Sequence, residues 1–351
     1  MKKFWILLMT AVFLSGISVQ VYATSSAAVL PLLISPGARA SGMGEAFVAV
    51  ADDATATFWN TAGLAFQTGR EITFMHANWL PQLVSDMSIE FLAYRQRFAS
   101  LGGTLAANIT YFNYGEQTRT GEQGPEPLGT FRSWDLAVTL CYGTKISQNM
   151  GLGIGMRYIR SNLAEMGAGA EKGNGVGSSF AVDVGVLYKM AFLKGLAFGM
   201  NLSNMGPKIT YVDAAQADPL PTNLKIGLSY QVLDNEFNKL MIAVDTNKLM
   251  VVRHKDGTSD PFYKALATAW SDGTLKEQAN RLISSCGAEY CYNNMIYLRA
   301  GYYYDYDGRV KYPSFGAGLQ YYKYRFDFAY VAAEQGSPLS DTMRFSLTAG
   351  F

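Results

Sequence analysis

Large apolar side chains alternate with small or polar ones along much of this chain, with a period of two residues. A period of two is that of a β-strand whose two faces meet different surroundings. The last stretch shows it most clearly, with Met343, Phe345, Leu347, Ala349 and Phe351 on one face and Thr342, Arg344, Ser346, Thr348 and Gly350 on the other. The chain is therefore expected to be all-β.

Fourteen segments with this alternation follow residue 69. Each is roughly ten residues long, the length that a tilted strand needs to cross a membrane. They lie near residues 70–78, 86–97, 102–114, 131–143, 150–161, 177–189, 195–204, 222–233, 239–247, 283–292, 295–305, 311–321, 324–333 and 341–351.

The connections between these segments alternate in length. Long ones lie at 115–130, 162–176, 205–221 and 248–282, and the last carries helix-favouring residues within 261–281. The intervening turns are short, and long outer loops with short periplasmic turns are typical of outer-membrane barrels. The pattern predicts a 14-stranded antiparallel transmembrane β-barrel over residues 69–351, integral to the bacterial outer membrane, with a short extracellular helix in the longest loop.

Two segments precede the predicted barrel. Residues 1–23 have a basic start at Lys2 and Lys3, an apolar run and a small-residue cleavage site ending at Ala23, which is typical of a secretory signal peptide. The apolar run is too short to span a membrane. The mature chain would begin near Thr24, and residues 24–68 would precede the first strand from the periplasmic side.

Residues 24–68 are interpreted as a plug inside the lumen. Fourteen strands enclose a lumen too wide for their own side chains to fill. Small residues in this segment allow tight turns and close packing, and Asp52 or Asp53 is expected to cap a short helix through Phe58. The candidate plug residues are Gly37, Arg39, Gly42, Met43, Gly44, Asp52, Asp53, Phe58, Trp59 and Asn60.

Charge and composition exclude several classes of function. The formal net charge is +1 and only 16% of residues are charged, with no basic run, so nucleic acid is not an expected partner. The three cysteines, an odd number, argue against a disulfide framework. His76 and His254 stand in no metal-binding or catalytic spacing. No enzyme activity, cofactor or metal is expected.

Charged side chains of both signs fall on the predicted lumen face. They are Glu90, Arg157, Asp183, Lys225, Asp245, Arg299, Arg325, Asp327 and Arg344. The favoured interpretation is a lining whose charges pair with one another and anchor the plug. The alternative is a path for a polar solute.

The stretch SPGARASGMGEAFVAVADDATATFWNTAGLA (residues 35–65) resembles the N-terminal signature of the PorV/PorQ family and, more distantly, of the FadL long-chain fatty-acid transporters. Further stretches resemble the PorV branch, which belongs to the type IX secretion system. They are NWLPQLVSDMSIEFLAY (78–94), MRYIRSNLA (156–164), PLPTNLKIGLSY (219–230) and SPLSDTMRFSLTAGF (337–351). The terminal Phe351 resembles the signal read by the outer-membrane assembly machinery.

This resemblance implies a FadL-like barrel that acts as a non-enzymatic secretion component. It would bind cargo proteins by their C-terminal signal domain and pass them from the Sov/SprA translocon to a PorU-type sortase attachment complex. The matching motifs imply partner-binding loops at Trp79, Leu80, Pro81, Pro219, Leu220 and Pro221. Loop-on-loop packing or contact with lipopolysaccharide explains these residues equally well. The alternative function is FadL-like transport of hydrophobic small molecules, with Phe47, Phe58 and Trp59 lining a pocket.

Overall fold

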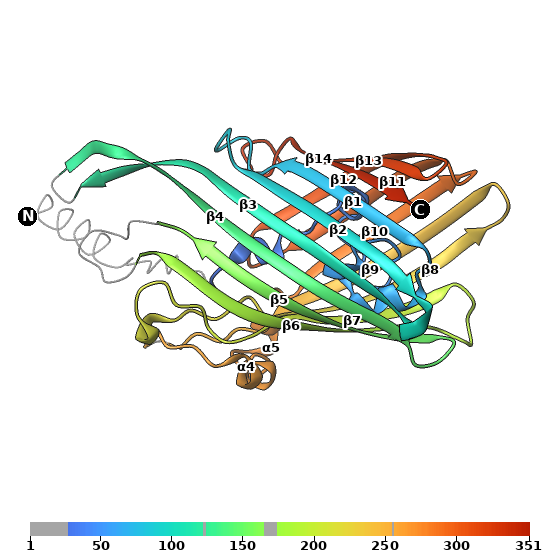
Figure 1. Ribbon diagram of the computed structural model, residues 1–351, viewed down its shortest axis with the longest axis horizontal. Coiled ribbons are helices and arrows are strands. Elements are labelled where there is room, and N and C mark those ends of the chain that lie inside the picture. The colour runs from blue at the N-terminus through green and yellow to red at the C-terminus, as the bar shows by residue number, and fades with distance from the viewer. Residues whose placement is uncertain (1–26, 122–123, 165–173, 255) are drawn as a thin grey trace, which may run out of the picture.

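The computed structural model describes residues 27–121, 124–164, 174–254 and 256–351. The predicted signal peptide lies outside these residues. Fourteen strands form a closed barrel in which each pairs antiparallel with its neighbours, and β1 closes onto β14 (Figure 1). The strands are β1 (Arg70–Asn78), β2 (Ser88–Phe98), β3 (Gly103–Gly121), β4 (Gly124–Lys145), β5 (Met150–Asn162), β6 (Val176–Lys189), β7 (Leu196–Met205), β8 (Asn223–Asp234), β9 (Asn238–Leu249), β10 (Ile283–Tyr292), β11 (Ile296–Asp305), β12 (Val310–Tyr321), β13 (Tyr324–Val331) and β14 (Thr342–Gly350). The predicted 14-stranded antiparallel barrel is confirmed.

The period of two separates the inner and outer faces of the wall. In β14, Met343, Phe345 and Leu347 are exposed on the outside, whereas Arg344 and Ser346 are buried inside. A strand in a bilayer barrel keeps its apolar side chains toward lipid and its polar ones toward the lumen.

One residue that was predicted to face the lumen lies on the outer face of the barrel. Glu90 lies on the outer face of β2 beside Leu92, and its carboxylate oxygen is 2.7 Å from Nδ1 of His76 on β1. The inner face of β2 carries Ile89 and Phe91 instead, both fully buried. Here the lumen face is apolar because it packs against another part of the chain, so hydrophobicity alone did not identify the outer face.

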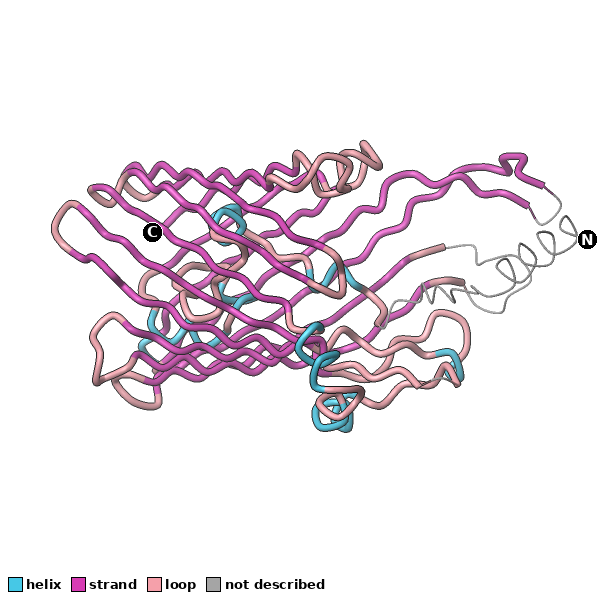
Figure 2. Tube along the Cα trace, turned by 180° about the vertical axis from the view of Figure 1, so that it is seen from behind, coloured by secondary structure: helices cyan, strands magenta, loops and turns pink. Residues whose placement is uncertain are grey.

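The two ends of the barrel differ, as predicted. One end, the turn side, has connections as short as Tyr322–Lys323 between β12 and β13. The other, the loop side, carries the long connections, including two helices after β9, α4 (Phe262–Thr268) and α5 (Leu275–Asn280), which Figure 2 shows in cyan. The short helix expected within 261–281 is therefore two helices. None of the helices in the described residues has the length and apolarity to cross a membrane.

The expected loop at 115–130 is instead a strand pair. β3 is 19 residues long and β4 is 22, and both run well past the rim on the loop side (Figure 1). Their outer parts pair only with each other, from Glu116↔Arg132 to Gly121↔Gly124. We call residues 116–121 and 124–132 the ribbon.

Residues 27–68, the N-terminal segment, lie against the inner face of the wall. Near its start the amide of Ala28 donates to Pro219 O on the loop side, and near its end Gln67 O accepts from the hydroxyl of Thr104 on the turn side. The segment thus runs the length of the barrel. It contains four short helices, η1 (Leu30–Leu33), α2 (Ala38–Gly42), α3 (Ala56–Trp59) and η2 (Thr61–Phe66). Nearly all of its residues are buried.

The expected helix cap is wrong in detail. Thr55 occupies the N-cap position of α3 and its side chain makes no capping hydrogen bond. Asp53 accepts from the amide and hydroxyl of Thr55, before the helix begins, and Asp52 pairs with Arg39. Both aspartates are drawn into an ion-pair cluster that local sequence does not reveal.

Candidate functional site

A buried arginine ties the N-terminal segment to the barrel wall. Arg39 of α2 donates from Nε and Nη2 to the two carboxylate oxygens of Glu289 on β10, at 2.8 and 2.7 Å. Its Nη1 also pairs with Asp52 at 2.5 Å and Asp53 at 3.2 Å. A two-pronged guanidinium–carboxylate pair fixes orientation as well as position. Arg39 therefore sets how α2 sits in the lumen.

Wall arginines extend this cluster around the lumen. Arg299 of β11 bridges Glu289 at 2.6 Å and Asp327 at 2.8 Å, and Arg325 of β13 bridges Asp327 at 2.8 Å and Asp53 at 3.2 Å. Burial raises the pKa of Asp53, but the charges of Arg39 and Arg325 together with two hydrogen bonds from Thr55 lower it, and the net pKa is lowered. The cluster holds charges that would be costly to bury unpaired.

Wall side chains also bind the main chain of the N-terminal segment. One carboxylate oxygen of Asp245 on β9 accepts from the amides of Phe47 and Val48, at 2.6 and 2.8 Å. The hydroxyl of Ser314 accepts from Gly44 at 2.9 Å. Because buried amides need acceptors, these bonds satisfy amides that lie between the short helices of the segment.

Glycines line the wall where the N-terminal segment comes closest. A Cβ on Gly143 would lie 2.7 Å from Cβ of Leu64, and one on Gly151 2.8 Å from Cβ of Ala65. Added Cβ atoms at further wall glycines would collide with main-chain atoms of the segment. They are Gly153, Gly199, Gly287 and Gly301. The wall is therefore shaped to this segment, not merely wide enough for it.

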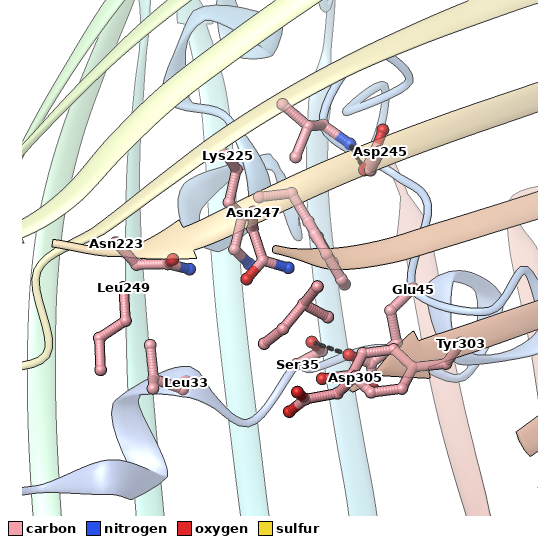
Figure 3. A pocket seen from close by; sticks show the side chains of 13 residues that line it. Leu33, Ser35, Glu45, Asn223, Lys225, Asp245, Asn247, Leu249, Tyr303 and Asp305 are labelled. Atoms are coloured by element: carbon pink, nitrogen blue, oxygen red, sulfur yellow. Dashed lines mark hydrogen bonds between the residues drawn. The ribbon is translucent and has the colours of Figure 1, made fainter. Parts of the chain in front are cut away.

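A cavity of about 210 Å³ lies beside the N-terminal segment, toward the loop side (Figure 3). Its lining includes Leu33, Trp59, Lys225 and Tyr303. The ammonium of Lys225 lies 4.5 Å from the ring centre of Phe58 and 4.4 Å from that of Trp59. The aromatic residues expected to line a lumen pocket thus pack the segment and leave only a small, partly polar space.

The structure brings the candidate plug residues into one interior region. Gly37 and Gly44 adopt positive φ angles of 94° and 64°, which favour glycine. Asn60 donates to Val48 O and Val186 O, and so joins two parts of the segment to β6. Gly42, Met43 and Trp59 are buried beside the wall, whereas the side chain of Asp52 is 56% exposed. The sequence pattern did not single out Glu289 or Glu45. Glu289 nevertheless lies on the same, lumen-facing side of β10 as Ser285 and Gly287.

The two predicted partner loops differ in exposure. Trp79, Leu80 and Pro81 are half-buried at the loop side, next to Leu83, which is 64% exposed. Pro219, Leu220 and Pro221 are buried, and Leu220 packs with residues of the N-terminal segment and the same loop, such as Leu32 and Ile209. Loop-on-loop packing, one of the explanations that the sequence leaves open for residues 219–221, accounts for their burial.

Among the described residues no group of three or more His, Cys, Asp or Glu is placed to hold a metal ion. Cys141, Cys286 and Cys291 are all free thiols. His76 pairs with Glu90, and His254 lies 3.0 Å from Asp260 in the loop before α4.

Closed topology, an apolar outer face and the difference between the two ends define an integral outer-membrane β-barrel. The loop side is accordingly extracellular and the turn side periplasmic. The toluene transporters TbuX of Ralstonia pickettii and TodX of Pseudomonas putida have similar solved structures. TbuX is 14% identical, with 90% of this chain and 98% of that chain covered and a TM-score of 0.52. TodX is 13% identical, with 90% and 96% covered and a TM-score of 0.54.

A FadL homologue of Pseudomonas aeruginosa is 13% identical, with 89% of this chain and 97% of that chain covered and a TM-score of 0.50. At these identities the likeness shows a FadL-like fold and no more. The family described as "Type IX secretion system protein PorV" matches residues 18–256, and this chain belongs to it. The chain is thus an outer-membrane component associated with the type IX secretion system, a non-enzymatic kind of protein. No curated protein matches it.

Proposed function

We propose that this protein receives secreted cargo at the cell surface by the cargo's C-terminal signal domain. It takes the cargo from the translocon (Sov/SprA) and passes it to a PorU-type sortase attachment complex, without chemistry of its own. Membership of the PorV family supports the link to the type IX secretion system. One structural observation supports the proposed role. The N-terminal segment lies against the inner face of the wall and is tied to it by the Arg39–Glu289 pair, which supports a plugged lumen and a working surface on the extracellular side.

In this proposal residues 24–68 form a plug that closes the barrel. Ion pairs, main-chain hydrogen bonds and glycine contacts hold it on several sides of the wall. Displacing it would break a buried charge pair, which costs roughly 3–5 kcal/mol when one partner is lost. A rigid plugged barrel is a suitable scaffold for binding loops.

Exposed apolar side chains on the extracellular loops are the proposed partner contacts. Leu83 lies beside the half-buried Trp79–Pro81 stretch, and Tyr263 and Leu275 project from the helical loop with 69% and 90% of their surface exposed. Isolated exposed apolar residues are common, but three on one rim suit a protein or lipopolysaccharide contact. Pro219–Pro221 act instead by holding the loop over the N-terminal segment.

The second candidate is FadL-like transport of hydrophobic small molecules. The cavity beside Trp59 favours it, since Leu33, Leu249 and Ile283 give it apolar walls. Against it, Lys225, Asp245 and Asp305 line the same space. The structures of toluene transporters support the fold and not this activity.

The test is affinity purification of the intact protein from detergent-solubilised outer membranes, with a tag inserted after Gly169. Mass spectrometry is expected to find a large translocon barrel and exported proteins that share one C-terminal domain. A protein that comes alone and carries a bound apolar molecule would overturn the proposal in favour of transport. An untagged strain gives the background.

A further inference from the structure

The ribbon leaves two strand edges without a neighbouring strand in the described residues. β2 pairs with β3 only as far as Ser88↔Asn113, and β5 pairs with β4 only as far as Asn162↔Trp134. Beyond these points each strand has one partner. Main-chain N–H and C=O groups on such an edge are available to another extended chain.

The direction of these groups along β3 follows from one hydrogen bond. Asp86, in the loop between β1 and β2, accepts the amide of Glu116 at 2.7 Å. The N–H of Glu116 therefore points away from β4, toward the outer edge. Because N–H directions alternate along a paired strand, that of Thr118 points the same way, and the intervening Gln117 faces β4. Asp86 occupies the first acceptor position that an added strand would fill, and Thr118 is the next position.

The opposite edge of the ribbon is protected. β4 carries Pro125 and Pro127 in its outer part, and Pro127 is the partner of Thr120 across the ribbon. Proline lacks an N–H and blocks the addition of a strand, which is one way that natural sheets protect their edges. The described outer residues of β3 contain no proline. Among the described residues the two edges are thus unequal, because the outer part of β4 carries two prolines and that of β3 carries none.

The described side chains of the ribbon are mostly exposed, so little packing among them stabilises it. In its outer part Leu128 is 64% exposed, and Glu116, Thr118 and Thr130 are exposed polar residues. An isolated two-stranded hairpin is marginally stable at best in water, and a third strand stabilises it.

We propose that the outer edge of β3, centred on Thr118, accepts an extended strand of the exported polypeptide as a third strand of the ribbon. The occupant is a polypeptide because the open groups are main-chain donors and acceptors in strand spacing. An added strand binds mainly through its main-chain hydrogen bonds, so the same edge accepts exported proteins of differing sequence. The identity of the occupant rests on the proposed function.

Two matched proline variants of the tagged full-length protein test this. Thr118→Pro removes an N–H from the open edge of β3, and Thr130→Pro changes its partner across the ribbon, on the edge that already carries prolines. Thr118→Pro is expected to reduce co-purified exported protein roughly tenfold, since proline removes a donor and its ring obstructs the strand. Thr130→Pro is expected to retain wild-type recovery. On gels a folded barrel migrates more slowly after boiling than before it, and this shift verifies that both variants fold.

A photo-crosslinking residue, p-benzoylphenylalanine, in place of Thr118 or of Thr130 gives the second measurement and does not depend on a proline. Crosslinks to exported protein from position 118 and not from 130 support the proposal. Equal recovery with both proline variants, or crosslinks from 130 alone, overturns it while leaving the proposed function intact. Failure of the wild-type protein to retain any exported protein overturns the proposed function itself, and this inference with it.

Discussion

In the described residues, ion pairs hold the N-terminal segment to one half of the barrel wall, whereas close glycine contacts occur in both halves, including Gly287 and Gly301. On β10, β13 and β14, ion pairs join wall to segment, through Glu289, Arg325 and Arg344. Among the described residues no ion pair joins the segment to β4–β8, where glycines such as Gly143 and Gly153 let the two backbones touch. Charge pairing is strong and sensitive to pH, whereas close approach is sensitive to a single added methyl group. The difference shows which substitutions will loosen each side.

The largest expected effect is on the charged side. Glu289→Ala leaves Arg39 and Arg299 buried without their shared carboxylate, with side chains 9% and 0% exposed. Breaking a buried pair in this way costs roughly 3–5 kcal/mol. We expect the segment to become sensitive to protease and the barrel to conduct ions in planar bilayers. Glu334→Ala is the control, because its pair with Lys311 is exposed and such pairs contribute about 0–1 kcal/mol. Equal protease sensitivity and equal conductance of the two variants would contradict the role of Glu289 in holding the segment to the wall.

The next effect is on the glycine side and uses two neighbours on β5. Gly153→Ala drives a methyl group into the main chain at Thr61, whereas Gly155→Ala makes only ordinary contacts, the nearest at 3.4 Å to Asp183 and Cys141. Overpacking typically costs about 1–3 kcal/mol. Gly153→Ala is expected to lower the unfolding temperature and raise conductance while Gly155→Ala changes neither. Equal effects from both would show that the wall tolerates bulk here.

How much of this arrangement was visible in sequence depended on the range of the interaction. The period of two located β1 and β10 at their observed bounds, because alternation is local. The Arg39–Glu289 pair joins residues 250 positions apart, and nothing in either neighbourhood marks the other. Glu90 was placed on the wrong face because Ile89 and Phe91 are apolar for packing against the N-terminal segment. The glycines and prolines of the ribbon are turn residues, so the sequence predicts a loop where the structure has a strand pair.

Only the half of the wall that carries ion pairs is expected to loosen its hold on the N-terminal segment at low pH. The pKa of Asp53 is lowered in the folded protein, since Arg39, Arg325 and two hydrogen bonds from Thr55 together offset the effect of burial. A lowered pKa contributes stability that is fully present above the unfolded value of about 3.9 and is lost as pH falls through the folded value. Conductance is therefore expected to stay low from neutral pH to about 4 and to rise below it. Asp53→Asn should remove this dependence, and an unchanged acid response would assign it to other groups.

The smallest expected effect tests whether any charge matters on the glycine side. Near the periplasmic end, the ammonium groups of Lys189 and Lys145 lie 4.3 and 5.0 Å from the ring centre of Phe66 in the N-terminal segment. An exposed cation–aromatic contact contributes about 0.5–1 kcal/mol, and removing one lysine also relieves its repulsion from the other. Lys189→Ala is therefore expected to shift the unfolding temperature only slightly more than Lys194→Ala, a lysine with no ring contact among the described residues. A loss as large as that of Glu289→Ala would mean that charge, and not close approach, holds both halves of the wall to the N-terminal segment.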